Sequence, residues 1–414
     1  ANGEELVADN TLITPDSVLD FTSSESFDEL FVHESQTESM NPMTNDMVRI
    51  PSFRRVERGA TLNVVAMLAM HQNGKVSGAY VDFYRGMLLA LEDLRRDGYS
   101  INLTVLDTQR SVACVSELIC SDAVQNADLI IGPSYEPELA VVLPLAEELG
   151  IPVVSPLIDV DAEKVSSPNL FQMRPDDKYK YEKYAHLFDG SHQIYIVFGT
   201  TSDMRFAQEI ADYANQKGVA VRMINAKEGR TASFTLRNAD GTSGAAVGTS
   251  TLVHAAGKKA LFIVADKGRE IVSILNTLGE SIKSMVPGAS NECTVVGHRN
   301  WDNLTYTDRE GYFNAGVSYI TPYNAKHTDN NAMKVFESRF LSTYGLLPTP
   351  YSCRGYDAMM LFATKMFAGL DKYILLERIT PLATPYQFKF EDGMFINAEW
   401  VNTQFMRDFT VSYK

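Results

Sequence analysis

The sequence has no lysine or arginine in its first 48 residues. Eleven of the chain's 52 acidic residues lie in that segment, and the remainder holds 41 acidic against 37 basic residues. Nucleic-acid binding requires clustered positive charge, so this composition argues against DNA or RNA as a partner. The net charge of −15 therefore belongs mostly to one segment, and the body of the chain is nearly neutral.

Long apolar runs are also missing. Apolar runs such as residues 129–131 and 260–265 fall far short of the roughly 18 residues that span a bilayer. The sequence therefore predicts no membrane span. With 414 residues, of which 45% are hydrophobic, the chain is long enough for more than one domain with a full core.

Cysteine and metal-ligand patterns are sparse. The chain has 4 Cys, and Cys114 and Cys120 fall on different faces of a predicted helix, which favours free thiols over a disulfide. The 7 His residues show no metal-ligand spacing. We therefore expect neither a structural metal nor a cofactor.

The acidic segment is rich in Ser, Thr and Asn and lacks sustained apolar periodicity. Such a composition is typical of a linker or a loosely docked arm, which we place at residues 1–58. The chain begins at Ala1 without a Met, a basic start or an apolar signal core. This beginning fits a targeting segment that was removed before Ala1.

From residue 61 onward, short apolar runs alternate with helical patterns. Apolar residues recur every three to four positions from Tyr80 to Leu94, which predicts a helix that Gly98 ends. Strands are predicted at 62–70, 101–106, 129–131 and 151–154, with helices between them. Strands that alternate with helices indicate a parallel sheet with right-handed connections.

A second series of the same kind follows residue 175 and predicts a second sheet. Its strands are expected at 194–198, 219–224, 261–265 and 294–296. A Gly-, Ala-, Ser- and Thr-rich stretch at 227–257 is interpreted as an insertion, with a hairpin as one option. Later residues predict helices at 332–344 and 356–367 and a hairpin around Asp392-Gly393. The fold class is therefore α/β with two Rossmann-like lobes.

Open parallel sheets bind ligands beyond the carboxyl ends of their strands. Ser134 and Ser155 each follow such a strand beside a Pro and are candidate ligand contacts, although a Ser at either place also fits a helix cap. Tyr135 and Trp301 are candidates for stacking on a ligand, with packing as the alternative for Trp301.

Charged and hydroxyl side chains complete the candidate set. Arg110 and Arg174 suit an anionic ligand, and Arg174 equally suits a salt bridge at a hinge. The other candidates at the strand ends are Glu136, Asp159, Ser202 and Asp266.

Several motifs in fixed order resemble type I periplasmic binding proteins, the class of the branched-chain amino-acid receptors. The longest match is Ile131-Gly132-Pro133 followed by residues 143–156. Supporting matches are Phe83-Tyr84-Arg85-Gly86, Leu106-Asp107-Thr108, residues 171–175 and Gly355-Tyr356-Asp357-Ala358. The resemblance implies two lobes joined by three hinge crossings, with a ligand cleft between them. It assigns 59–175 plus 325–372 to lobe 1 and 176–324 plus 373–414 to lobe 2.

The resemblance also implies a non-catalytic protein of the periplasm or cell envelope that delivers a ligand to a transporter or reports it to a receptor. In amino-acid-binding members, small hydroxyl residues follow the Gly-Pro and Ser-Pro motifs, whereas this chain has Glu136 and Asp159 nearby. Two acids there would repel a ligand carboxylate. The Phe83-Tyr84-Arg85-Gly86 motif of the first helix is more similar to the corresponding motif of envelope proteins that join this fold to a peptidoglycan-binding LysM module. A related lobe pair occurs in lipoprotein activators of penicillin-binding proteins.

Three functions therefore stand as hypotheses. The first is a solute-binding or receptor protein whose lobes close on a small molecule. The second is an interaction module that contacts or regulates peptidoglycan machinery without using its cleft for an amino acid. The third is an enzyme, which finds little support because the chain has no Gly-x-Ser-x-Gly elbow and no phosphate-binding loop.

Overall fold

The computed structural model of the chain describes residues 36–40, 47–199, 203–225, 233–237, 243–265, 268–285, 292–298, 301, 309–323 and 331–413. These residues form two compact units. Unit 1 takes residues up to 177 together with 323–399, and unit 2 takes 178–322 together with 400–414. The chain therefore passes between the units three times, as the sequence predicts.

Unit 1 is built on a seven-stranded sheet. In spatial order its strands are β17 (Phe388–Glu391), β18 (Met394–Asn397), β9 (Leu170–Gln172), β8 (Val153–Ser155), β7 (Leu129–Ile131), β3 (Thr61–Leu68) and β6 (Ser100–Asp107). Every neighbouring pair is parallel except β17 with β18. Strands β7 and β8 are buried at every position, as expected for parallel strands that are covered on both faces. The predicted parallel sheet is confirmed.

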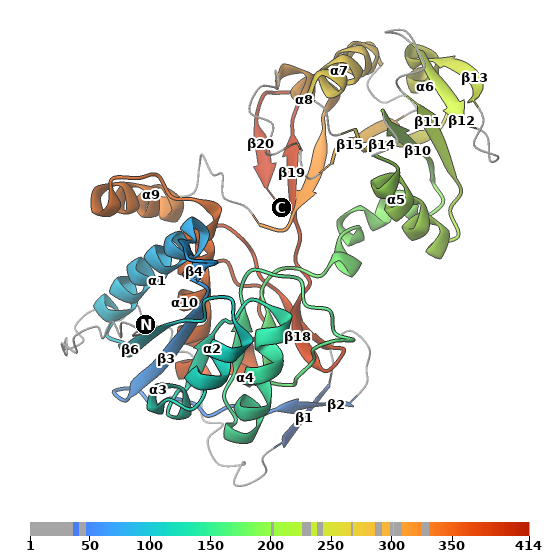
Figure 1. Cartoon of the computed structure of the whole chain (residues 1–414). Helices are drawn as coiled ribbons and strands as arrows, with labels where there is room; N and C mark the ends of the chain where they lie inside the picture. The colour runs from blue at the N-terminus through green and yellow to red at the C-terminus, as the bar shows by residue number, and fades with distance from the viewer. Residues whose placement is uncertain are drawn as a thin grey trace, which may run out of the picture. The chain divides into compact units, whose positions relative to one another are not determined.

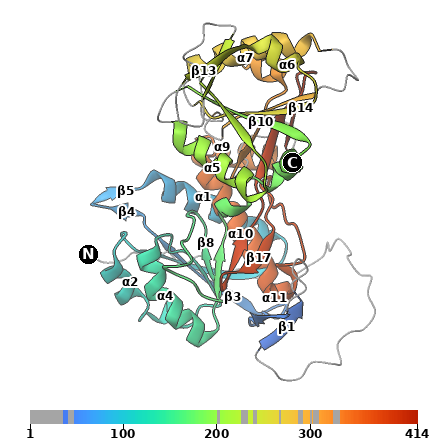
Figure 2. The same cartoon turned by 90° about the vertical axis from the view of Figure 1, so that its right-hand side faces the viewer.

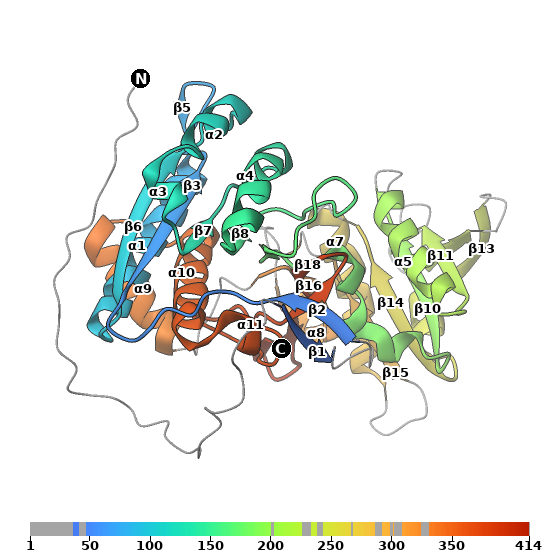
Figure 3. The same cartoon turned by 90° about the horizontal axis from the view of Figure 1, so that it is seen from below.

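Helices lie on both faces of this sheet (Figures 1 and 3). Those on one face are α1 (Gly78–Arg96) and α10 (Pro350–Ala368), and those on the other are α2 (Val112–Leu118) and α4 (Glu136–Leu149). A Cβ on Gly86 would lie 1.8 Å from the Ser352 carbonyl oxygen, and one on Gly355 would lie 1.9 Å from that of Phe83. Glycine at these two positions therefore brings α1 and α10 into backbone contact.

The remaining elements of unit 1 are short or peripheral. They are β1 (Gln36–Met40), β2 (Met47–Pro51), β4 (His71–Gln72), β5 (Lys75–Val76), α3 (Asp122–Gln125), η1 (Asp177–Tyr179, at the passage to unit 2), α9 (Asn331–Tyr344) and α11 (Leu370–Tyr373). Within the described ranges, no helix combines the length and apolar character that crossing a membrane requires.

Unit 2 is built on a nine-stranded sheet. In spatial order its strands are β13 (Ser243–Gly248), β12 (Ser233–Arg237), β11 (Val221–Asn225), β10 (His192–Phe198), β14 (Lys258–Ile263), β15 (Glu292–Val296), β16 (Ser318–Thr321), β19 (Val401–Phe405) and β20 (Val411–Tyr413). Strands β11, β10, β14, β15 and β16 are parallel to their neighbours in that series. The antiparallel pair β12 and β13 confirms a hairpin within the predicted insertion.

The sheet of unit 2 also has a helix layer on each face (Figure 2). Its helices are η2 (Glu182–Phe188), α5 (Met204–Gln216), α6 (Thr249–His254), α7 (Gly268–Lys283) and α8 (Glu310–Ala315). Helices α6 and α7 lie opposite α5 across the sheet. Residues of α6, α7 and α8 share one apolar core with strands β10 and β14.

The end of the predicted N-terminal arm belongs to the core of unit 1. Ile50, Phe53 and Val56 are buried there, and β2 pairs with β1. The Phe53 ring lies 5.5 Å from the ring of Phe171 in β9. The prediction of a linker as far as residue 58 is therefore wrong for residues 50–58, because three apolar side chains at a spacing of three find a place under the sheet.

The predicted position of the C-terminal hairpin is also corrected. The hairpin itself is confirmed, since β17 and β18 pair around Asp392-Gly393. However, β18 pairs with β9, so residues 373–399 complete unit 1 and only 400–414 join unit 2. The sequence assigned all of 373–414 to the second lobe. Stacking of Phe395 on Phe171, at 4.2 Å between ring centroids, anchors the hairpin in unit 1.

Asp357 is a buried carboxyl in the middle of α10, which begins at Pro350, before the predicted start at residue 356. Its two oxygens accept hydrogen bonds from the Leu382 amide at 3.1 Å and from the Tyr386 hydroxyl at 2.9 Å. Asp357 thus joins α10 to the segment that leads into β17. Burial disfavours the ionised form and raises the pKa of Asp357 from 3.8 to about 7.

We predict that Asp357→Asn changes how stability depends on pH. In the wild type, the unfolded state loses the Asp357 proton near pH 4 and the folded state only near pH 7. The free energy of unfolding should therefore fall between these values, by on the order of 3–4 kcal/mol, and this loss is complete above pH 7. The asparagine variant lacks this loss, so it should gain stability relative to wild type as the pH rises.

Urea unfolding at intervals from pH 4 to pH 8 measures this difference. Asp97→Asn, which changes an exposed acid at the end of α1, is the matched control. A difference between wild type and Asp357→Asn that stays constant across this range would contradict the prediction.

Candidate functional site

The carboxyl ends of four parallel strands meet at one edge of the unit 1 sheet. These strands are β3, β6, β7 and β8, which end at Leu68, Asp107, Ile131 and Ser155. The side chains at these ends and in the loops 69–77, 108–111, 132–135 and 156–159 are here called the carboxyl edge. Ligands of parallel sheets bind at such edges because backbone amides and helix N-termini point there.

Two buried serine hydroxyls lie at the carboxyl edge. Ser134 is 2% exposed and Ser155 is fully buried, and neither Oγ atom makes a hydrogen bond of full geometry. The alternative role of Ser134 as a helix cap is wrong, because α4 starts after Tyr135 without a side-chain cap. The phenol of Tyr80 lies close to Ser134, and burial raises the pKa of Tyr80. Buried hydroxyls usually have partners, so these two have hydrogen-bonding capacity for a bound molecule or water.

Arg110 and Tyr135 form an aromatic stack at the same edge. The Arg110 guanidinium carbon lies 4.3 Å from the centroid of the Tyr135 ring. Gln72 Nε2 donates to the Tyr135 hydroxyl at 3.3 Å, which holds the ring from the β4–β5 hairpin. Arg110 is exposed and makes no ion pair with the residues that the structure describes. The predicted role of Arg110 toward an anionic ligand stays a prediction.

The loop that carries Arg110 is strained. Gln109 and Arg110 have φ values of 53° and 54°, a region that residues other than glycine rarely adopt. Asp107 Oδ1 accepts the Gln109 amide at 3.0 Å, and its Oδ2 lies 2.6 Å from the ring of His71. Such strain persists only where surrounding contacts fix it, and it is often found at functional sites. The loop thus holds Arg110 in one place over Tyr135.

Glu138 is a functional candidate that the sequence did not reveal. Its side chain is 2% exposed, and burial raises its pKa. Four neighbouring groups partly lower the pKa of Glu138 again: the Thr108 hydroxyl, the amides of Ser111 and Tyr135, and the charge of Arg110. An acid in the first turn of a helix usually faces solvent. The available signal was its spacing of four from buried Val142, which places both on one face of α4.

Glu136 and Asp159 are neutralised by neighbours in unit 1. The Glu136 carboxylate accepts the Asp161 amide at 3.0 Å and lies 3.8 Å from Lys164 Nζ. Asp159 lies 2.6 Å from Arg174, which confirms the salt-bridge interpretation of Arg174. Cationic neighbours therefore offset part of the charge of both acids, and the expectation that they repel a ligand carboxylate stays a prediction.

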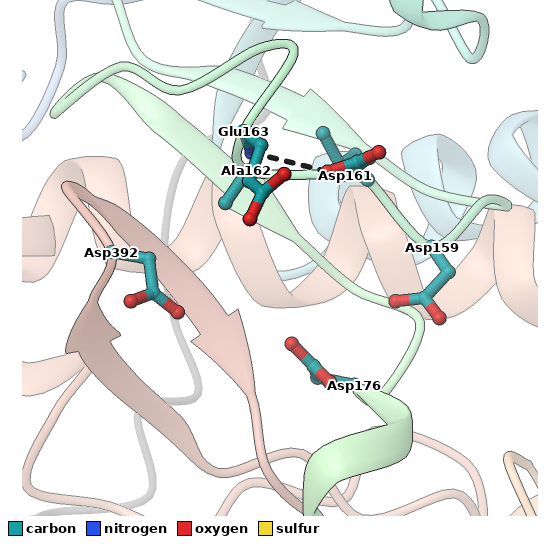
Figure 4. A pocket seen from close by; sticks show the side chains of 7 residues that line it. Asp159, Asp161, Ala162, Glu163, Asp176 and Asp392 are labelled. Atoms are coloured by element: carbon teal, nitrogen blue, oxygen red, sulfur yellow. Dashed lines mark hydrogen bonds between the residues drawn. The ribbon is translucent and has the colours of Figure 1, made fainter.

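An acidic pocket of about 540 Å³ lies beside the Asp159–Arg174 pair (Figure 4). Its lining residues are Asp159, Val160, Asp161, Ala162, Glu163, Asp176 and Asp392. Asp161 lies 2.7 Å from Lys164 Nζ and also accepts the Glu163 amide, so part of this negative charge is already compensated. Among the described residues, no group of three or more His, Cys, Asp or Glu is arranged to hold a metal ion.

Trp301 packs in the core of unit 2. Its side chain is fully buried, and its indole N–H donates to the Ala265 carbonyl at 2.8 Å. A Cβ on Gly297 would lie 2.5 Å from the Trp301 ring, so the ring fills the space beside that glycine. The prediction that Trp301 stacks on a ligand is therefore wrong, and the packing alternative holds. Ser202 and Asp266 lie outside the described residues.

Comparisons with known proteins agree with this geometry. The family model of the receptor family ligand binding region matches residues 84–231, less than half of the chain. No curated protein sequence is significantly similar to the chain. Among solved structures, a putative branched-chain amino acid ABC transporter from Rhodospirillum rubrum is 14% identical with a TM-score of 0.57, covering 86% of this chain and 100% of its own. Full-length LpoA from Haemophilus influenzae is 12% identical with a TM-score of 0.53, covering 88% of this chain and 60% of its own.

These likenesses establish the fold. The chain has the two-lobe α/β fold of type I periplasmic binding proteins, as the sequence motifs predict. At identities of 14% and 12% they do not carry over a ligand or a partner. The particular similarity to envelope proteins that carry a LysM module stays a prediction.

We predict that Gly132→Ala strongly destabilises the protein. Gly132 has φ of 89°, and an added Cβ would lie 2.0 Å from the Met67 carbonyl oxygen. Backbone of β3 and of the β7–α4 loop would have to separate, at a cost of about 3 kcal/mol or more. Gly59→Ala is a matched control, because Gly59 has φ of 91° but nothing within 4 Å of the added atom. Denaturant unfolding should show the larger loss for Gly132→Ala, and equal losses would contradict the assignment.

Proposed function

We propose that this protein is a non-catalytic binding protein of the cell envelope that holds a small molecule at the carboxyl edge of unit 1. The observation that carries the proposal is the pair of buried hydroxyls of Ser134 and Ser155, neither of which makes a hydrogen bond of full geometry, on the edge that also carries the Arg110–Tyr135 stack. Together they offer hydrogen-bond donors and acceptors, a positive charge and an aromatic face. These are the groups with which pockets orient a small polar ligand.

The same hydroxyls support a binding role over catalysis. A catalytic serine needs a general base within hydrogen-bond reach. Neither Ser134 nor Ser155 has such a partner among the described residues, and the ring of His71 is engaged with Asp107. The expectation that the second lobe closes over the ligand stays a prediction.

An interaction module is the alternative function, in which the same fold contacts envelope proteins or peptidoglycan machinery. One observation favours it beyond the likeness to LpoA. Large apolar side chains are exposed where α9 leads into α10, namely Leu341, Leu346, Leu347 and Tyr351, which are 48%, 50%, 70% and 40% exposed. Exposed apolar residues gathered in one short stretch are typical of contact surfaces.

We predict that ligand affinity depends on the carboxyl edge. Thermal-shift screening of amino acids, peptides, sugars and cell-wall fragments should identify a compound that raises the melting temperature. Calorimetry should then show Ser134→Ala and Ser155→Ala binding it about 2- to 10-fold more weakly, because each removes one hydrogen bond. Ser342→Ala, an exposed serine of α9, should bind it as the wild type does.

Two results would reject the small-molecule proposal. One is the absence of any stabilising compound, and the other is full affinity in both serine variants. Binding to a purified envelope protein that survives both serine substitutions and is lost in Leu347→Asp would instead support the interaction module.

A further inference from the structure

Arg354 is a positive charge in unit 1 for which the described residues supply no counter-charge. It lies in the second turn of α10, where its guanidinium carbon is 3.7 Å from the centroid of the Tyr323 ring. Its side chain is half-buried. Among the residues that the structure describes, no carboxylate lies within ion-pair distance of this guanidinium, and none of its nitrogens donates a hydrogen bond.

The groups around Arg354 do not neutralise it. Besides burial, the phenols of Tyr323, Tyr386 and Tyr351 and the like charge of Arg174 affect the charged state of Arg354. The charge of Arg354 lowers the pKa of Asp357 one turn along α10, but the two Asp357 oxygens accept hydrogen bonds from Leu382 and Tyr386. Burial lowers the pKa of Arg354, as expected where a cation is partly removed from water.

The stack on Tyr323 leaves the hydrogen-bonding edge of Arg354 unused. A guanidinium that stacks uses its flat face, while its five N–H donors point outward in the plane. Placing such a charge among protein atoms is costly unless an anion accepts those donors. The planar fork matches the two oxygens of a carboxylate or a phosphate.

The backbone connects Arg354 to the carboxyl edge. The charge of Arg174 acts on Arg354. Arg174 follows Met173, whose amide donates to the Ser155 carbonyl at 2.9 Å. Arg174 itself is engaged with Asp159 and Asp177. Thr349, the N-cap of α10, donates to Asp82 near the start of α1 at 3.0 Å. The start of α10, which carries Arg354, therefore lies beside the helix that follows loop 69–77 of the carboxyl edge.

We propose that Arg354 recognises a carboxylate or phosphate group on the small molecule that unit 1 binds. This inference rests on the proposed binding function and adds a chemical class to it: the ligand is an anion, or carries an anionic group. Tyr323 fixes the plane of the guanidinium, so that two parallel hydrogen bonds form without reorientation. The acids that would have opposed such a ligand, Glu136 and Asp159, are already paired.

Matched anionic and neutral compounds test the proposal. The probes are inorganic phosphate, succinate with succinamide, and glutamate with glutamine, each titrated at constant ionic strength. In the wild type the anionic member of each pair should bind more tightly. Arg354→Gln should weaken anion binding about 10- to 100-fold and abolish the preference, because a charge-assisted pair of hydrogen bonds is lost.

Arg54→Gln is the matched control, since Arg54 is also in unit 1 but is exposed and pairs with Asp128 at 3.4 Å. It should keep the anion preference. Arg354→Lys should keep the preference with weaker binding, because it retains the charge but not the planar fork. Without ligand, Arg354→Gln should melt at or above the wild-type temperature, whereas a structural arginine would lower it on removal.

The outcomes separate the two levels of the proposal. If neutral probes bind as tightly as anionic ones, or if Arg354→Gln keeps the preference, the assignment of Arg354 is overturned while the binding function stands. If no probe and no compound of the wider screen binds, the binding function fails and the assignment fails with it. A lower melting temperature for Arg354→Gln together with unchanged anion binding would show a structural role.

Discussion

Parallel pairing of β3, β6, β7 and β8 is the constraint on which the candidate site depends. Because these strands run in one direction, their polar ends gather at one edge, and the loops that follow must find room there. Gly132 makes this possible, since its backbone passes so close to Met67 that no side chain fits. Ser134 and Tyr135 then lead from this edge into α4, and Arg110 lies over the Tyr135 ring.

Local patterns predicted most of the fold, and distant pairing explains the errors. The hairpin at Asp392-Gly393 is recognisable because both residues adopt positive φ, of 54° and 75°, in a tight turn. The sequence does not show to which unit the hairpin belongs. That depends on the pairing of β18 with β9, more than 200 residues earlier, through Phe395 and Phe171. Phe53 was misjudged for the same reason: its partner rings are distant in sequence and its neighbours are polar.

The same distinction between local patterns and distant packing applies to the residues of the candidate site. Ser134, Tyr135 and Arg110 could be named from the sequence because each follows a predicted strand, and the structure brings Tyr135 and Arg110 together. Glu138 could not be named, since its burial depends on how α4 packs. Arg354 could not be named from the sequence. Nothing in its local sequence shows that its guanidinium lies against the ring of Tyr323, which precedes α9 in the chain.

Charge pairing, and not net charge, determines what this protein can attract. The chain is strongly acidic overall, yet the acids near the carboxyl edge are largely compensated: Glu136 lies by Lys164, and Asp159 pairs with Arg174. Arg110 and Arg354 are stacked on tyrosines and make no ion pair with the described residues. Under the proposed binding function, these two arginines would offer positive charge to an anionic ligand, on a protein whose total charge is negative.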